Sequence, residues 1–209
     1  MLNLTGKKVV VIGGGSVAHR KIIELLQAGA IVTVVSPHLH PKLDPYYRCQ
    51  KFQWRKKKFE PVDIEDAMMV IAATNQKKVN ERVCQAASSW QLLNVVDQSE
   101  LGNFHVPAKL SRGKLTIAVS TNGASPILAQ TIRNEISEFY HDSFEEYLHF
   151  LSLARKHIKK HVSDIVERKR LLKELTEKDY RESVEKQKDF LERVVHSNEQ
   201  SEEKFGTSD

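Results

Sequence analysis

The chain has 209 residues and a mass of 23.9 kDa, enough for one large domain or for one domain with a smaller appendage. Its 40% hydrophobic and 28% charged residues support a packed core and argue against wholesale disorder. No apolar run is long enough to span a membrane, and the amino-terminal segment lacks the features of a signal peptide. Cys49 and Cys84 are too few for a disulfide framework and lack metal-ligand spacing. We therefore expect a cytoplasmic protein with free thiols, no membrane association and no metal site.

The charge balance is mildly basic, with 32 Lys and Arg against 27 Asp and Glu and a formal net charge of +5. Such a balance suits an acidic partner, but it does not choose among nucleic acid, anionic lipid and a polycarboxylate metabolite. Aromatic residues make up only 7%, and no stretch alternates them with basic residues as single-strand binders do. We expect no nucleic-acid partner.

Short apolar runs alternate with helical patterns up to about residue 111, which is typical of βαβ units with a parallel sheet. In chain order we expect strands at Lys8–Ile12 and Ile31–Val35 around a helix at 17–28, then strands at 68–73 and 92–96 around a helix at 79–88. Two further runs at 104–110 and 115–120 flank Ser111-Arg112-Gly113 and predict a hairpin.

The turn between the first strand and the first helix matches the dinucleotide-binding pattern G-x-G-x-x-G/A at Gly13, Gly15 and Ala18. Gly13 permits the tight turn, and Gly15 lets a pyrophosphate approach the backbone because it has no Cβ. Ala18 is small enough for the helix to pack against the strand. The amino terminus of the helix then offers N–H groups and a partial positive charge to the phosphates.

The second strand ends in Val-Val-Ser36-Pro37-His38 and lacks the carboxylate that usually bonds the ribose 2′-hydroxyl in NAD-specific sites. Ser36 could bond the ribose instead, while Pro37 and His38 could wall the adenine. Since no carboxylate repels a 2′-phosphate, this motif by itself leaves NAD and NADP both open.

After Ser125-Pro126 the pattern is helical almost to the end of the chain, and it is rich in Lys, Arg and Glu from about residue 155. We expect an α/β fold: a Rossmann-type parallel sheet domain at 1–112, a strand–helix segment at 113–144 and a helical domain at 145–198. The middle segment is too small for a core of its own, so we assign it to a subunit interface. Residues 199–209 are expected to form a disordered tail.

Four motifs resemble those of the precorrin-2 dehydrogenase family of siroheme synthesis, in the same order and spacing: GGGSVAHRK, AATN at 72–75, NVVD at 94–97 and STNGASP at 120–126. The resemblance extends from about residue 3 to residue 150. It implies oxidation of precorrin-2 to sirohydrochlorin, with NAD as hydride acceptor, in a homodimer. We expect the helical domain to cover the substrate cleft. Some members also insert ferrous iron, which leaves a bifunctional dehydrogenase and ferrochelatase as one alternative. A non-catalytic binder of a tetrapyrrole or nucleotide is the other.

The resemblance also implies roles for single residues. Ser16 and Val17 would contact the cofactor just after the glycines. Ala73 and Thr74 close the strand at 68–73, where a Rossmann site meets the ribose and the nicotinamide.

Asp97, at the end of NVVD, matches the catalytic aspartate of the family. Its position also makes chemical sense, because open α/β sheets bind ligands at the carboxyl ends of their strands. Oxidation of the macrocycle releases a hydride and a proton, and a carboxylate nearby can accept the proton or stabilise the developing charge. Thr121 and Asn122 are the expected substrate contacts: Thr121 stands where some members carry a phosphorylated serine, and Asn122 replaces a glycine.

The remaining polar residues carry weaker signals. The nine histidines form no metal motif, so we interpret most of them as surface residues. The basic run at 55–58 is interpreted as a solvated edge.

Overall fold

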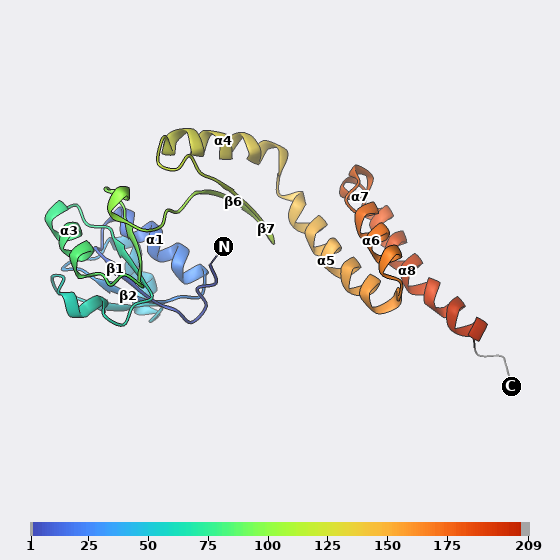
Figure 1. Cartoon of the computed structure of the whole chain (residues 1–209), viewed down its shortest axis with the longest axis horizontal. Helices are drawn as coiled ribbons and strands as arrows, with labels where there is room; N and C mark the ends of the chain where they lie inside the picture. Colours follow the sequence, from blue (N-terminus) through green and yellow to red (C-terminus); the bar gives the residue numbers. More distant parts are fainter. Residues whose placement is uncertain (1, 206–209) are drawn as a thin grey trace. The chain divides into compact units, whose positions relative to one another are not determined.

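The computed structural model describes residues 2–205, and the side chains of residues 2–194. The chain divides into two compact units, Met1–Val106 and Pro107–Asp209 (Figure 1). Among the described residues, no helix is long and apolar enough to cross a membrane.

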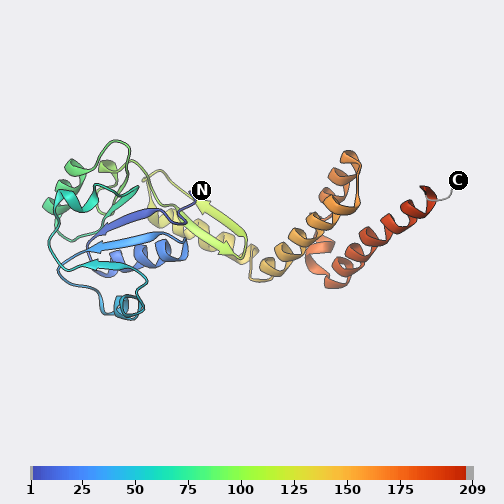
Figure 2. The ribbon, with the colours of Figure 1, turned by 90° about the horizontal axis from the view of Figure 1, so that it is seen from below.

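The first unit is built on a five-stranded parallel sheet in the order β3-β2-β1-β4-β5 (Figure 2). The strands are β1 (Lys8–Ile12), β2 (Ile31–Val35), β3 (Gln53–Arg55), β4 (Met69–Ala72) and β5 (Leu92–Val95). The chain leaves β1 towards β2 and returns on its other side to β4, so the strand order reverses between β1 and β4. Such a switch point opens a crevice at the carboxyl ends of the strands, which is where α/β sheets bind ligands.

Helices cover both faces of this sheet. Alternate residues of β1 face opposite sides: Val9 and Val11 pack with α1 (Ser16–Gln27), and Val10 and Ile12 pack in the core that includes Val83 of α3 (Lys77–Ala86). Burial on both faces explains why β1 is a continuous apolar run. The predicted strands and helices of this region, and the α/β class, are confirmed.

Two elements between β2 and β4 were not expected from the sequence: α2 (Asp44–Arg48) and the short edge strand β3. Three single-turn 3-10 segments, η1 (Pro41–Leu43), η2 (Pro61–Ile64) and η3 (Ser99–Leu101), complete this unit. The basic run that begins at Arg55 is more than a solvated edge. Arg55 and Lys57 lie 3.0 Å and 3.1 Å from an oxygen of Asp63, whose side chain is only 1% exposed.

The second unit begins with an antiparallel hairpin of β6 (Ala108–Arg112) and β7 (Leu115–Val119), on which α4 (Pro126–Phe139) packs. The hairpin was expected, but its first strand begins at Ala108 and not at residue 104. Because β6 pairs with β7, it belongs to this unit, and the division at Val106/Pro107 falls before the expected boundary at residue 112.

The rest of the second unit is helical and has its own core. Its helices are α5 (Ser143–His161), α6 (Ile165–Glu174), α7 (Lys178–Glu182) and α8 (Val184–Phe205). Phe150, Ile158, Leu175 and Phe190 are buried at its centre. The tail expected from residue 199 overlaps the end of α8, and residues 206–209 lie outside the described part of the chain.

Candidate active site

Three consecutive glycines join β1 to α1, and their surroundings differ. Gly13 has a φ of +116°, and a Cβ there would lie 2.3 Å from the Ala73 carbonyl oxygen. A Cβ on Gly14 would lie 2.2 Å from the His38 carbonyl oxygen. Both glycines are therefore required by the protein's own packing, since the loop lies directly against the segments that follow β2 and β4, the strands on either side of β1.

Gly15 is different. It is the one described glycine that has neither a positive φ nor a neighbour within 4 Å of an added Cβ. It also stands at the N-cap of α1, where no side chain within the described range caps the helix. Free space beside a glycine, together with first-turn N–H groups, fits the pyrophosphate of a dinucleotide. Exposed Ser16 and half-buried Val17 follow it in the first turn.

The segment after β2 closes over this loop. Ser36 is 3% exposed, and its hydroxyl donates to the His38 carbonyl oxygen at 2.8 Å. The His40 N–H donates to the Gly14 carbonyl oxygen at 2.7 Å. Ser36 thus lies beneath the glycine loop, whereas Pro37 and His38 are exposed at the end of the strand. No carboxylate follows β2, as the sequence shows.

A pair of histidines flanks the same loop. The rings of His19, in α1, and His40 stack with their centroids 5.4 Å apart. The pKa of His19 is lowered, first by burial and then by the nearby His40 and Lys42. A neutral His19 therefore adds no charge beside the first turn of α1 at physiological pH.

At the ends of β4 and β5 the buried side chain of Asn80 joins Thr74 to Asp97. Asn80 Nδ2 donates to Asp97 Oδ1 at 2.9 Å and to the Thr74 carbonyl oxygen at 3.1 Å. Asn80 Oδ1 accepts from the Thr74 hydroxyl at 2.7 Å and from the Thr74 N–H at 3.3 Å. Two residues that the sequence indicated separately, Thr74 and Asp97, are therefore brought together by a third that it did not.

Asp97 is exposed, and within the described residues it forms no ion pair. Its carboxylate is therefore accessible, as a proton acceptor needs to be. Nearby on α3, the pKa of Cys84 is raised, mainly by burial and further by the charges of Glu81 and Asp97. This keeps the Cys84 thiol protonated and unreactive.

The structure thus connects most of the predicted residues of the first unit. Gly13 contacts Ala73, Gly14 contacts Ser36 and His38, and Asn80 joins Thr74 to Asp97. Sequence reasoning missed Gly14 and Asn80. The signal for Asn80 was available: it is a polar residue beside apolar positions of a helix whose inner face is buried, including Val83.

Thr121 and Asn122 lie in the second unit, in the turn between β7 and α4. The Thr121 hydroxyl donates to the Ser125 carbonyl oxygen at 2.9 Å and accepts from the Ser125 N–H at 3.0 Å. Asn122 has a φ of +50°, the left-handed conformation in which glycine is favoured and asparagine tolerated. The local turn therefore accounts for both residue types.

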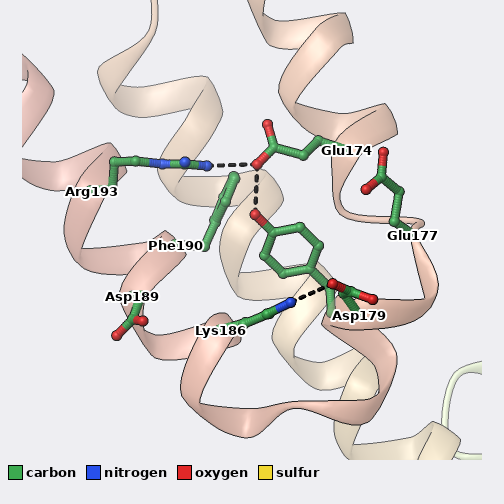
Figure 3. A pocket seen from close by; sticks show the side chains of 8 residues that line it. Glu174, Glu177, Asp179, Lys186, Asp189, Phe190 and Arg193 are labelled. Atoms are coloured by element: carbon green, nitrogen blue, oxygen red, sulfur yellow. Dashed lines mark hydrogen bonds and ion pairs between the residues drawn. The ribbon is translucent and has the colours of Figure 1, made fainter.

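A pocket of about 480 Å³ lies in the helical part of the second unit (α5–α8, called the helical unit below) and contains none of the predicted site residues (Figure 3). Its polar groups are largely paired with one another. Glu174 accepts from the Tyr180 hydroxyl at 2.6 Å and from Arg193 at 2.7 Å, and Lys186 pairs with Asp179. In the described part of the chain, no three His, Cys, Asp or Glu residues are grouped so as to hold a metal ion.

Comparison with known proteins divides the chain into three matching regions. A family model described as "Putative NAD(P)-binding" matches residues 1–108, "Sirohaem biosynthesis protein central" matches 112–138 and "SirC C-terminal domain" matches 144–190. The precorrin-2 dehydrogenase of Priestia megaterium is 35% identical over 93% of this chain and 96% of its own length. That of Bacillus subtilis (strain 168) is 36% identical over 68% of this chain and 88% of its own length.

A solved structure described as "SirC, precorrin-2 dehydrogenase" superposes with a TM-score of 0.86 at 34% identity, and it covers 94% of this chain and 98% of its own. The siroheme synthase of Neisseria meningitidis serogroup C is 36% identical over 80% of this chain but matches only 35% of that longer protein. The similarity therefore includes the helices that follow residue 143, which the four sequence motifs did not reach.

Proposed function

The chain belongs to the precorrin-2 dehydrogenase family of NAD-dependent oxidoreductases in siroheme biosynthesis, and from this premise we propose that it oxidises precorrin-2 to sirohydrochlorin. The observation that carries the proposal is the site at the switch point of the sheet. There the open space beside Gly15 and the exposed carboxylate of Asp97 belong to one connected set of residues.

The cofactor would be held by residues from three strand ends. Gly13, Gly15, Ser16 and Val17 would bind the pyrophosphate at the amino terminus of α1. Exposed Pro37 and His38 would lie beside the adenosine, with Ser36 supporting the loop from below. Ala73 and Thr74 would meet the ribose and the nicotinamide. When bound, NAD supplies the acceptor for the hydride.

The chain's own chemical contribution is the carboxylate of Asp97. Conversion of precorrin-2 to sirohydrochlorin removes two hydrogens: one leaves as a hydride from carbon, and the other leaves as a proton from nitrogen. Asp97 would accept this proton or stabilise the positive charge that precedes its loss. Thr121 and Asn122 would contact the tetrapyrrole from the turn before α4.

We also propose that the enzyme is a cytoplasmic homodimer paired through residues 113–144. Three apolar side chains of α4 are strongly exposed: Ile127 by 78%, Leu128 by 50% and Phe139 by 75%. A second copy of the chain would bury them, and the two-stranded sheet beside them is too small to form a core alone.

The decisive assay is anaerobic incubation of the purified protein with precorrin-2 and NAD, with and without ferrous or cobaltous ion. We expect equal amounts of NADH and sirohydrochlorin, and no metal insertion above the spontaneous rate. Binding of the tetrapyrrole without NADH formation would instead identify a non-catalytic carrier. Metallation that is lost in Asp97→Ala would identify a bifunctional enzyme.

A further inference from the structure

The side chain of Asn80 is fully buried, at 0% exposure, at the start of α3. A primary amide has two donor hydrogens and two acceptor lone pairs. All four are used here, since Nδ2 donates to Asp97 Oδ1 and to the Thr74 carbonyl oxygen, while Oδ1 accepts from the Thr74 hydroxyl and N–H. The amide is therefore fixed in one orientation, because a flipped amide would turn its oxygen towards the Asp97 carboxylate.

Packing alone does not explain an asparagine at this position. The same helix buries Val83, and burial of an amide costs free energy unless its hydrogen bonds are satisfied. An apolar residue would fill the space without that requirement. The amide adds hydrogen bonds that connect the segment after β4 to the segment after β5. Its partner after β5 is the exposed carboxylate of Asp97.

The link continues to the glycine loop. Gly13 lies directly against the peptide between Ala73 and Thr74, where an added Cβ would be 2.3 Å from the Ala73 carbonyl oxygen and 3.2 Å from the Thr74 nitrogen. The loop, the end of β4 and the Asp97 carboxylate are thus held together through the backbone of Thr74 and the side chain of Asn80. An exposed aspartate without this bond would be free to change rotamer.

We propose that Asn80 is a positioning residue that holds the Asp97 carboxylate in a fixed relation to the end of β4. The inference rests on the proposed function, in which Asp97 acts on the tetrapyrrole while the end of β4 meets the cofactor. Asn80 then acts on the rate through Asp97 and not by contact with either ligand. A displacement of about 1 Å in such a group can cost about 10²-fold in rate.

The alternative is that Asn80 only stabilises the turn after β4, since it makes three of its four bonds to Thr74. Changing a purely structural residue would lower stability, and it would affect kcat no more than a similar change elsewhere in the same unit. Asn94 of β5 offers the matched control. It is also buried, at 7% exposure, but its Nδ2 donates to the Phe104 carbonyl oxygen at 3.0 Å, away from Asp97.

The test compares Asn80→Asp with Asn94→Asp, which make the same isosteric change at two buried positions. We expect Asn80→Asp to lower kcat by about 10- to 100-fold, with the Kd for NAD and the KM for precorrin-2 within about threefold of their original values. Asn94→Asp should change kcat by less than about threefold, although both variants lower the urea midpoint. If Asn80→Asp does not fold, Asn80→Ala, which removes the donor to Asp97, serves for the same comparison with Asn94→Ala.

A double-mutant cycle with Asp97→Ala separates this inference from the proposed function. If Asn80 acts through Asp97, adding Asn80→Asp to Asp97→Ala should lower kcat by less than about threefold more. Multiplicative effects, or an equal loss of kcat in Asn94→Asp, would overturn the positioning role and leave the catalytic role of Asp97 intact. Full activity of Asp97→Ala would instead remove the catalytic assignment and, with it, the role of Asn80.

Discussion

Two polar clusters, one in each unit, place a carboxylate next to a hydrogen-bond donor, but they do so in opposite ways. In the helical unit, Glu174 accepts from both Tyr180 and Arg193 (Figure 3). In the first unit, Asp97 receives a bond from the neutral amide of Asn80 and has no cationic partner in the described residues. The carboxylate of Glu174 therefore has a cationic partner, whereas the exposed carboxylate of Asp97 has none among the described residues. This is the contrast that we expect between a cluster that stabilises the fold and the proposed catalytic one.

The largest effect is expected at Gly15, where no protein atom lies within 4 Å of the position of an added Cβ. Gly15→Val should abolish NAD binding, because the new side chain would occupy the phosphate position while meeting no protein atom within 4 Å of its Cβ. Titration calorimetry measures the affinity, and circular dichroism with urea unfolding checks the fold. Unchanged NAD affinity would remove the cofactor assignment.

Gly14→Ala is the matched control for this variant. Its Cβ would lie 2.2 Å from the His38 carbonyl oxygen, so we expect a loss of about 1–3 kcal/mol in the free energy of unfolding. We therefore expect Gly15→Val to change the NAD affinity and Gly14→Ala to change the stability of the fold.

Asp97→Ala tests whether the exposed carboxylate of the first unit acts in the reaction. Removal of a general base or charge stabiliser costs about 10²–10⁴ in rate. NAD affinity should be retained, because the carboxylate is assigned to the tetrapyrrole and not to the nucleotide. Stopped-flow measurement of NADH formation gives the rate, and calorimetry gives the affinity. A parallel loss of NAD binding would place Asp97 at the cofactor instead.

Sequence reasoning succeeded where a single segment carries the whole signal. The buried runs of β1 and β2 were predicted with their observed bounds, and the glycine turn between β1 and α1 was interpreted correctly as a tight turn. It failed where an element is short and polar, as in β3 (Gln53–Arg55), because three residues give no usable periodicity.

Sequence reasoning also failed where a residue's hydrogen-bond partner is distant in the chain. The sequence predicts a strand from residue 104, but β6 begins only at Ala108, and the side chain of the preceding Asn103 bonds to the backbone of Gln91 and Leu93 in and beside β5. In the same way, nothing near Asn80 in the sequence indicates that it meets Asp97. The predicted site residues could be found one by one, but the residue that joins two of them depends on tertiary structure.

A smaller effect is expected at the proposed subunit interface. Its test compares substitutions at two exposed apolar positions of the second unit. Ile127 of α4 is 78% exposed and lies within the proposed interface, whereas Ile165 of α6 is 64% exposed and lies outside it. Loss of one buried apolar side chain costs about 1.5–3 kcal/mol, so Ile127→Glu should weaken the dimer by at least about tenfold. Sedimentation at micromolar concentration should show no such change for Ile165→Glu. A monomeric wild-type protein would contradict the interface itself.

The smallest effect is expected at Glu174, the carboxylate of the comparison that has a cationic partner in Arg193. Burial by itself would raise the pKa of Glu174, but the hydrogen bonds from Tyr180 and Arg193 outweigh it and lower this pKa. A carboxylate whose pKa is lower in the folded state stabilises the fold above its unfolded pKa, and this stabilisation is lost as the pH falls through the lowered value. Because the Arg193 side chain is 56% exposed, solvent screens the pair, and Glu174→Gln should cost only about 1 kcal/mol at neutral pH.

Urea unfolding as a function of pH tests this expectation. The stability difference between the wild-type protein and Glu174→Gln should be largest at neutral pH and should vanish on acidification, when the wild-type carboxylate is also uncharged. Tyr180→Phe, which keeps the ring against Phe190 at a centroid distance of 5.7 Å, should reproduce part of the loss. NAD affinity should not change in either variant, since both positions lie in the helical unit. A difference that persists at low pH would show that Glu174 stabilises the unit by packing and not by its charge, and the contrast with Asp97 would then no longer hold.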